Sequence, residues 1–316
     1  MKVRRLGTSG LKVSEIGLGC NNFGQRLDLE ATRRVVHRAL DLGITLFDTA
    51  DGYGNRGGSE TQLGEVLGAK RRDIVLATKF GWPMDDIGVL RGGSRRYLMR
   101  AVEDSLRRLK TDWIDLYQFH TPDPETPLEE TLRALDDLVR QGKVRYVGCS
   151  NFAGWQVADA AWISRSEGLA PFVSVQNEYS LLVRDVESEV VPAMRKFGLG
   201  LLPFFPLAGG LLTGKYRHGE PLPAGARLTD TKRSADRFLT ERNWRIVDAL
   251  QAFADSKGRK LVDVAVGWVL ARPWVGSVIA GATSAEQIES NVAAGAVRLA
   301  DDEIAELDRL TAPGAG

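Results

Sequence analysis

The feature that most constrains the fold is a regular alternation of short apolar runs with segments of helical periodicity. Apolar runs typical of buried β-strands occur eight times, at residues 16–18, 45–47, 74–78, 114–119, 144–148, 172–175, 199–205 and 276–280. Between these runs apolar residues recur at helical spacing, as Leu128, Leu132 and Leu135 do. Parallel strands need right-handed crossovers and helices that cover them. The pattern therefore predicts an α/β fold, a closed (β/α)8 TIM barrel, with an open doubly wound sheet as the alternative.

The length of the chain is compatible with one domain or two. It has 316 residues, and α/β barrels often exceed about 250 residues as one domain. The irregular segment at about 207–240 interrupts the repeating pattern without separating two patterns. We therefore predict a single domain over residues 1–316. A hairpin at 6–13 is expected to plug the barrel floor, and helices at about 240–256 and 301–310 exceed what the repeat requires.

Helix starts are marked by capping patterns. Thr126, Pro127 and Glu129 predict a capping box for the helix that carries Leu128 and Leu132. The same box is predicted in a Ser-x-x-Gln form by two further pairs, Ser59 with Gln62 and Ser284 with Gln287.

Composition and charge exclude several classes of function. Hydrophobic residues make up 43% of the chain and charged residues 26%, as in a globular enzyme. A formal net charge of +1 argues against a nucleic-acid or membrane-surface partner. No apolar signal region follows the start, and Pro203 and Pro206 break the uncharged stretch 197–214, so no membrane span is expected. Cys20 and Cys149 are expected to be reduced thiols of a cytoplasmic protein.

Four polar residues stand at or just past the ends of predicted strands, namely Asp48, Tyr53, Lys79 and His120. Strand ends converge on the carboxyl edge of a barrel, so these side chains are expected to meet. Tyr53 is the candidate acid, because Lys79 can lower the pKa of its phenol while Asp48 keeps Lys79 charged. His120 can orient a substrate oxygen. Each residue alone has an ordinary structural explanation, but together they predict a proton-transfer site without a metal.

A glycine pattern after the second strand offers another interpretation. Residues 52–57 match the G-x-G-x-x-G fingerprint of dinucleotide-binding folds. That fingerprint expects an acidic residue at the end of the next strand, where this chain has Lys79. We favour a loop that glycine frees to present Tyr53.

Residues after the later strands suit a cofactor with an amide and phosphates. Ser150, Asn151 and Gln176 offer donors and acceptors for a carboxamide, and Phe204 offers a flat face for stacking, although core filling explains a phenylalanine equally well. Cations in the long loop are suited to phosphates, as is the start of the last capped helix, whose N–H groups and dipole favour anions. The cations are Lys215 and Arg227, and the residues around the helix start are Gly281, Thr283, Gln287 and Asn291.

Taken together, these segments resemble the aldo-keto reductases, in the branch similar to bacterial homologues of potassium-channel β subunits. The resemblance extends from about residue 3 to 310. The motifs that carry it are Phe47-Asp48-Thr49-Ala50 with Tyr53, Thr78-Lys79, Leu116-Tyr117-Gln118-Phe119-His120, Gly148-Cys149-Ser150-Asn151-Phe152, Gln176-Asn177-Glu178-Tyr179 and Gly209-Gly210-Leu211-Leu212-Thr213-Gly214-Lys215.

The resemblance implies a (β/α)8 barrel that binds NADPH without a Rossmann domain and reduces aldehydes or ketones by hydride transfer. It implies Tyr53 as the acid, Lys79 and Asp48 as its tuners and His120 as the orienting residue. The cofactor residues that it implies are Ser150, Asn151, Gln176, Phe204, Pro206, Leu207, Gly209, Lys215, Arg227, Gly281, Thr283, Gln287 and Asn291.

Some positions depart from the family pattern. Phe204 stands where Tyr or Trp usually stacks on the nicotinamide, and Phe205 replaces a small polar residue. Gly281 and Gln287 stand where many members have Lys and Arg for the 2′-phosphate. NADPH is still expected over NADH, on the strength of Thr283, Lys215 and Arg227.

The substrate is expected to be a small carbonyl compound in an open pocket shaped by Phe23, Trp82 and the loop at 207–240. Two other functions compete with carbonyl reduction. One is a cofactor-binding, redox-sensing subunit with little turnover, and the other is a Schiff-base lyase or aldolase with Lys79 as nucleophile. The sequence favours neither a monomer nor a homo-oligomer.

Overall fold

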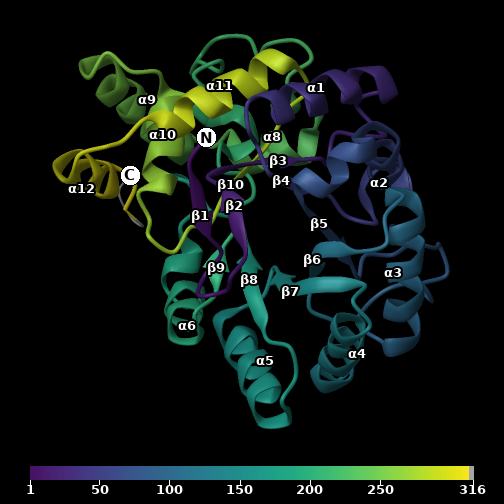
Figure 1. Cartoon of the computed structure of the whole chain (residues 1–316). Helices are drawn as coiled ribbons and strands as arrows, with labels where there is room; N and C mark the ends of the chain where they lie inside the picture. Colours follow the sequence, from purple (N-terminus) through teal and green to yellow (C-terminus); the bar gives the residue numbers. More distant parts are fainter. Residues whose placement is uncertain (313–316) are drawn as a thin grey trace.

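Eight parallel strands form the centre of the protein in the computed structural model, which describes residues 1–312 (Figure 1). Backbone hydrogen bonds from Leu201 N to Trp274 O (2.8 Å) and from Ile279 N to Pro203 O (3.2 Å) join the last strand to the seventh. The (β/α)8 barrel is therefore confirmed, and the doubly wound alternative is wrong. In spatial order the strands are β10 (Val278–Gly281), β3 (Ile16–Gly19), β4 (Leu46–Asp48), β5 (Val75–Phe80), β6 (Ile114–Phe119), β7 (Val144–Ser150), β8 (Phe172–Gln176) and β9 (Gly200–Leu201).

Helices surround the strands in a ring (Figure 1). Amphipathic helices such as α4 bury one apolar stripe, in this case Leu132, Leu135 and Leu138, whereas α10 is buried on nearly all sides. None of the helices within residues 1–312 has both the length and the apolarity needed to cross a membrane. The ring consists of α1 (Leu29–Asp41), α2 (Tyr53–Leu67), α3 (Arg95–Leu109), α4 (Leu128–Arg140), α5 (Gly154–Glu167), α6 (Val190–Phe197), α10 (Leu261–Leu270) and α11 (Ala285–Ala296), and the two extra helices expected from the sequence are α9 (Glu241–Ser256) and α12 (Asp301–Leu310).

The expected N-terminal hairpin is present and closes the barrel floor. Strands β1 (Val3–Arg5) and β2 (Lys12–Ser14) pair antiparallel and cross in front of the barrel strands in Figure 1. Leu6 and Val13 are fully buried in a small cluster with Leu46, Leu116 and other inward-facing residues of the barrel. The floor is therefore filled by side chains, which leaves the opposite end of the barrel for a site.

The seventh strand and the loop after it differ from the prediction. A strand was expected over 199–205, but β9 is only Gly200–Leu201. Pro203 and Pro206 lack the N–H needed to extend the ladder, and Phe205 has a left-handed φ of 49°. The segment expected to be irregular contains η3 (Ala208–Thr213), α7 (Arg227–Asp230) and α8 (Lys232–Phe238). Two other short 3-10 helices are η1 (Gly68–Asp73) and η2 (Asp185–Glu187).

Of the three predicted capping boxes, one N-cap is confirmed. The Ser284 side chain accepts from Gln287 N at 3.4 Å at the start of α11. Thr126 does not cap α4, because its hydroxyl donates to Asp123 at 2.7 Å instead and the helix begins one residue later than predicted. Ser59 lies within α2, where its Oγ donates to Cys20 O at 2.8 Å.

Candidate active site

A cavity of about 690 Å³ opens at the carboxyl ends of the barrel strands. It extends from the end of β4 to the start of α11, and nearly all the residues singled out in the sequence line it. These are Asp48, Tyr53, Trp82, His120, Ser150, Asn151, Gln176, Phe204, Pro206, Leu207, Gly209, Lys215, Arg227, Gly281, Thr283, Gln287 and Asn291.

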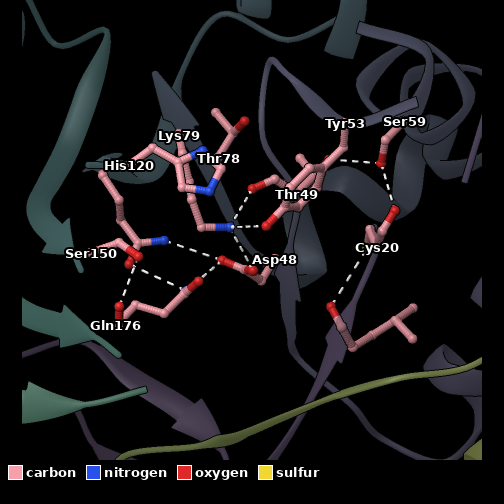
Figure 2. Close-up of polar contacts among 12 residues, drawn as sticks. Cys20, Asp48, Thr49, Tyr53, Ser59, Thr78, Lys79, His120, Ser150 and Gln176 are labelled. Carbon is pink, nitrogen blue, oxygen red and sulfur yellow. Dashed lines mark hydrogen bonds and ion pairs between the residues drawn. The ribbon is translucent and has the colours of Figure 1, made fainter. Parts of the chain in front are cut away.

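Lys79 lies beneath the cavity, in contact with two of the other three predicted catalytic residues. Its Nζ is 2.7 Å from Asp48 Oδ2, donates to Thr49 O at 2.8 Å and lies 3.5 Å from Tyr53 Oη (Figure 2). The side chains of Lys79 and Asp48 are 0% and 4% exposed. A charged pair this well buried is stable only because each partner neutralises and hydrogen-bonds the other.

The second carboxylate oxygen of Asp48 is held by two amides. Gln118 Nε2 donates to Asp48 Oδ1 at 3.1 Å and Gln176 Nε2 at 2.8 Å. Gln118 received no role from the sequence, although it lies on β6 two residues before His120. Because alternate residues of a strand point the same way, that spacing was the signal that could have identified it.

The ionisation of Lys79 and Tyr53 follows from these contacts. Burial alone would lower the pKa of Lys79, but the Asp48 carboxylate and the Tyr53 phenol outweigh burial and raise it. Lys79 is therefore held as an ammonium. Burial raises the pKa of Tyr53 above its ordinary value, and Lys79 acts in the expected lowering direction without reversing that rise. Tyr53 thus carries its proton at neutral pH.

A left-handed turn positions Tyr53. Four consecutive residues directly after it, from Gly54 to Gly57, have positive φ angles. A Cβ on Gly54 would lie 2.6 Å from Phe23 O, so the turn packs too tightly for a side chain at that position. The glycines therefore shape the turn that presents Tyr53, and β5, the next strand, carries Lys79 near its end in place of the acidic residue that the dinucleotide fingerprint expects.

His120 is covered by an aromatic wall. The Trp82 ring stacks on it with centroids 4.0 Å apart and planes 5° apart, and Tyr53 meets His120 edge-on at 5.6 Å. His120 Nδ1 is buried without a hydrogen-bond partner among the described residues. Burial, and after it the charge of Lys79, holds the pKa of His120 well below its ordinary range. The imidazole is therefore neutral at physiological pH.

The residues expected to bind an amide lie at the ends of β7, β8 and β9. Ser150 Oγ donates to Gln176 O at 2.7 Å, and Asn151 Nδ2 donates to His120 O at 2.9 Å. Phe204 lines the cavity beside Phe205, whose ring it meets at 77°. The barrel thus offers polar atoms and an aromatic face on one wall.

Five cations line the same cavity, namely Arg26, Lys215, Arg227, Arg233 and Arg237. Burial lowers the pKa of Lys215, and the nearby charges of Arg26 and Arg227 lower it further. Like charges held this close favour a bound anion. The sequence pointed only to Lys215 and Arg227, because the segment that carries the two α8 arginines lacked a regular pattern.

The far end of the cavity is built on the N-terminus of α11. Thr283 N donates to Gln287 Oε1 at 2.8 Å, and Asn291 is 6% exposed. Gly281 has no side chain to fill the space beside Asn22. A Cβ on Gly281 would lie 3.5 Å from Asn22 Nδ2. This end offers hydroxyl, amide and backbone donors to a ligand.

Phe23 is the one predicted site residue whose placement must be corrected. It was expected beside the substrate, but its side chain is 0% exposed in the main core and does not line the cavity. The tight approach of the Gly54 turn to Phe23 O covers this part of the chain. Trp82, the other predicted pocket residue, remains 40% exposed at the cavity.

Comparison with known proteins gives a consistent picture. Residues 15–312 match the sequence model described as Aldo/keto reductase family. The chain is 39% identical to an uncharacterized oxidoreductase, YrpG, of Bacillus subtilis, over 100% of this chain and 97% of that one. It is 35% identical to the L-glyceraldehyde 3-phosphate reductase of Escherichia coli (99% and 93%) and 36% identical to a probable voltage-gated potassium channel subunit beta of Oryza sativa (93% and 91%).

Proposed function

Because the chain belongs to the aldo/keto reductase family, and is thus a nicotinamide-dependent oxidoreductase of small carbonyl compounds, we propose that it reduces aldehydes or ketones with NADPH. Tyr53 is the proposed general acid. The observation that carries this proposal is the chain of contacts from Asp48 through Lys79 to Tyr53 beside a neutral His120.

NADPH, when bound, would supply the hydride for the carbonyl carbon and would itself be oxidised to NADP⁺. Tyr53 donates its phenolic proton to the carbonyl oxygen, which completes the alcohol. The phenolate left behind lies 3.5 Å from Lys79 Nζ, whose positive charge stabilises it until solvent returns a proton. General acid catalysis of this kind contributes about 10²–10⁴-fold in rate.

His120 and Asp48 act by orientation and charge. A neutral imidazole can donate a hydrogen bond to the carbonyl oxygen without competing with Tyr53 as a strong acid. Asp48 keeps Lys79 protonated, and its two carboxylate oxygens accept hydrogen bonds from Lys79 and from two amides.

The cavity suits a dinucleotide in an extended conformation. We assign Ser150, Asn151 and Gln176 to the nicotinamide amide and Phe204 to its ring face. A Cβ on Gly210, whose φ is 100°, would lie 3.2 Å from Lys215 Nζ, so the bare backbone leaves room for that ammonium in the proposed phosphate cradle. Pro206, Leu207 and Gly209 supply its backbone, with Arg227 opposite. The adenosine phosphate end is assigned to Gly281, Thr283, Gln287 and Asn291.

The preference for NADPH over NADH is also proposed. It rests on Thr283 at the α11 end and on Lys215, which has no carboxylate partner within residues 1–312, together with Arg227. Arg227 donates to Asn22 Oδ1 at 3.0 Å, which fixes the guanidinium in the cavity wall. A 2′-phosphate adds charge that such a positive cavity stabilises.

Two competing functions are less well supported. A Schiff-base lysine must be neutral to attack a carbonyl, whereas Asp48 raises the pKa of Lys79. A redox-sensing subunit is favoured by one observation, the relative named as a potassium channel subunit. That function would keep cofactor binding without turnover, so turnover separates the two.

We place the protein in the cytoplasm. Its two cysteines, Cys20 and Cys149, are free and buried, and burial raises the pKa of both thiols. Buried free thiols suit a reducing compartment.

The test is a fluorescence titration with NADPH and with NADH, followed by turnover of an aldehyde panel at the nicotinamide absorbance. The panel includes a phosphorylated aldehyde, since the Escherichia coli relative is named for one. Tyr53→Phe should abolish turnover and retain NADPH binding, whereas Tyr146→Phe, which alters a phenol outside the cavity, should retain both turnover and NADPH binding. Turnover by Tyr53→Phe would overturn the assignment of the acid. Cofactor binding without turnover by the wild type would favour the sensor.

A further inference from the structure

The cavity carries more positive charge than its wall neutralises. Of its five cations, Arg26 and Arg237 pair with Asp230 and Glu178, which lie outside the lining, and Lys215, Arg227 and Arg233 have no carboxylate partner among the described residues. The single carboxylate among the described lining residues, that of Asp48, is already paired with Lys79. A cavity of this sign attracts anionic ligands and raises their local concentration. The five cations differ in position, and this determines which anion each of them can bind.

Three of the cations form one group near the α11 end. Arg26 and Arg227 are close enough to Lys215 to lower its pKa. Arg227 bonds Asn22, and Asn22 Nδ2 donates to Ala282 O at 3.2 Å next to Gly281. This group therefore lies where the cofactor phosphates are proposed to bind, and Arg227 extends it toward the aromatic wall, with its Cζ 5.6 Å from the centroid of the Phe205 ring.

The other two cations, Arg233 and Arg237 on α8, lie toward the catalytic end. Arg237 forms an ion pair with Glu178, which pairs by an isolated bridge with Phe204 and follows β8 by two residues. The last residue of β8, Gln176, bonds Asp48. Arg237 is thus anchored above the strand ends that carry the proton-transfer residues.

Arg233 is not committed to any carboxylate within residues 1–312. It stands four residues before Arg237, so both side chains lie on one face of α8, and both line the cavity. Like charges at this spacing repel each other, and Glu178 offsets only the charge of Arg237, so Arg233 is left to bind another anion. Arginine pairs are suited to carboxylate and phosphate, which accept two parallel N–H bonds.

We propose that Arg233 and Arg237 form an anion subsite at the catalytic end of the cavity, so that the preferred substrates are aldehydes or ketones carrying a carboxylate or phosphate. This inference deepens the proposed reductase function and rests on it. Arg237 is positioned by Glu178, and Arg233 is the free partner that closes on the substrate anion.

The experiment compares matched pairs of aldehydes at saturating NADPH. One pair is succinic semialdehyde and butanal, and the other is glyceraldehyde 3-phosphate and glyceraldehyde. The wild type should favour the anionic member of at least one pair in kcat/KM, and the pair with the larger ratio tells carboxylate from phosphate. Arg233→Gln should reduce that ratio roughly tenfold or more, mainly through KM, as expected for loss of a hydrogen bond to a charged group.

Two further variants sharpen the test. Arg233→Lys keeps the charge without the fork and should recover part of the ratio. Arg245→Gln removes an exposed arginine of α9 that does not line the cavity, so its ratio should match the wild type. Arg233 is the more informative position to change, because removal of Arg237 would also leave Glu178 without its ion-pair partner.

Several outcomes would overturn the proposal. Equal kcat/KM for both members of each pair in the wild type would do so, as would an equal loss for both members in Arg233→Gln. A weakened NADPH affinity in Arg233→Gln with an unchanged ratio would assign this arginine to the cofactor. If the wild type binds NADPH but turns over neither neutral nor anionic aldehydes, the reductase function itself fails, which is a distinct result.

Discussion

Asp48 and Lys79 form an ion pair 2.7 Å long at the end of two adjacent strands, with side chains 4% and 0% exposed. Strands β4 and β5 pair in parallel with Asp48 opposite Ala77, two residues before Lys79. The register therefore places the lysine stem beneath the carboxylate and directs its ammonium toward Tyr53. Both charges are almost entirely buried, so the pair is stable only while both members are present.

Replacement of one partner should be costly. We expect Asp48→Leu to reduce the free energy of unfolding by about 3–5 kcal/mol, because it leaves a buried ammonium without its carboxylate. The double variant Asp48→Leu, Lys79→Met should be less destabilised than Asp48→Leu alone, and both should lack reductase activity. Urea unfolding of the set measures this. A double variant as unstable as the sum of the single variants would show that the pair is not coupled.

The stack of Trp82 on His120 predicts a change in pH dependence. Burial lowers the pKa of His120 well below its ordinary range, and Trp82 supplies part of that burial at 4.0 Å. In Trp82→Ala water reaches the imidazole, so its pKa should rise toward about 6.5. Because the proposed mechanism uses neutral His120, kcat/KM for a neutral aldehyde should then fall as the pH is lowered below about 6.5.

The control for this pH profile is Trp155→Ala. Trp155 is 65% exposed on α5 and does not line the cavity, so its variant should keep the wild-type profile. If kcat/KM of Trp82→Ala depends on pH in the same way as that of the wild type, the role given to the stack is refuted.

The barrel was predictable because its signals are local. Apolar runs such as 114–119 and helix spacings such as Leu132 to Leu135 are set by neighbouring residues, and the structure has strands and helices there. The end of β9 was not predicted correctly. A strand through Phe204 and Phe205 would need backbone hydrogen bonds that Pro203 and Pro206 cannot make.

The candidate site was predictable where residues sit at strand ends. Asp48, Lys79 and His120 follow directly from strand register. The burial of Phe23 and the role of Gln118 could not be predicted from the sequence, because both depend on contacts between segments that are distant in the chain. The burial of Phe23 depends on the turn at Gly54, and the role of Gln118 depends on the position of Asp48 on another strand. Such contacts between distant segments leave no periodic signal in the chain.

Asp51 predicts an unusual dependence of stability on pH. Burial, and after it the charge of Glu60, raises the pKa of Asp51 to about 8, while Tyr97 donates to its Oδ2 at 2.9 Å. The folded state therefore binds this proton more tightly than the unfolded chain. The resulting stability is present at low pH and is lost as the pH rises toward about 8. Each unit of pKa difference is worth about 1.4 kcal/mol.

Asp51→Asn removes this titration and keeps an acceptor for Tyr97. Relative to the wild type, the variant should gain stability as the pH is raised from about 5 to about 8, by more than about 1 kcal/mol. Urea unfolding across that range measures the difference, and Asp159→Asn, an exposed position on α5, serves as the control. A difference between Asp51→Asn and the wild type that stays constant with pH would contradict the prediction.

The left-handed turn after Tyr53 links backbone geometry to catalysis. Gly54 has a φ of 66°, and a Cβ there would lie 2.6 Å from both Phe23 O and Ser59 N. Gly168, at the end of α5, has a φ of 68° but nothing within 4 Å of its Cβ position. The two glycines therefore share a conformation and differ in their surroundings.

Gly54→Ala and Gly168→Ala separate these two effects. In both variants the free energy of unfolding should fall by roughly 1 kcal/mol, which is the cost of placing alanine in a left-handed conformation. The free energy of unfolding of Gly54→Ala should fall further, because the backbone must move to make room for the Cβ. Its kcat should fall at least about tenfold, because Tyr53 moves with the turn. Gly168→Ala should keep the wild-type kcat. Equal kcat values in the two variants would mean that the turn does not position the acid, and that the contacts of Tyr53 with Lys79, Trp82 and His120 hold it in place.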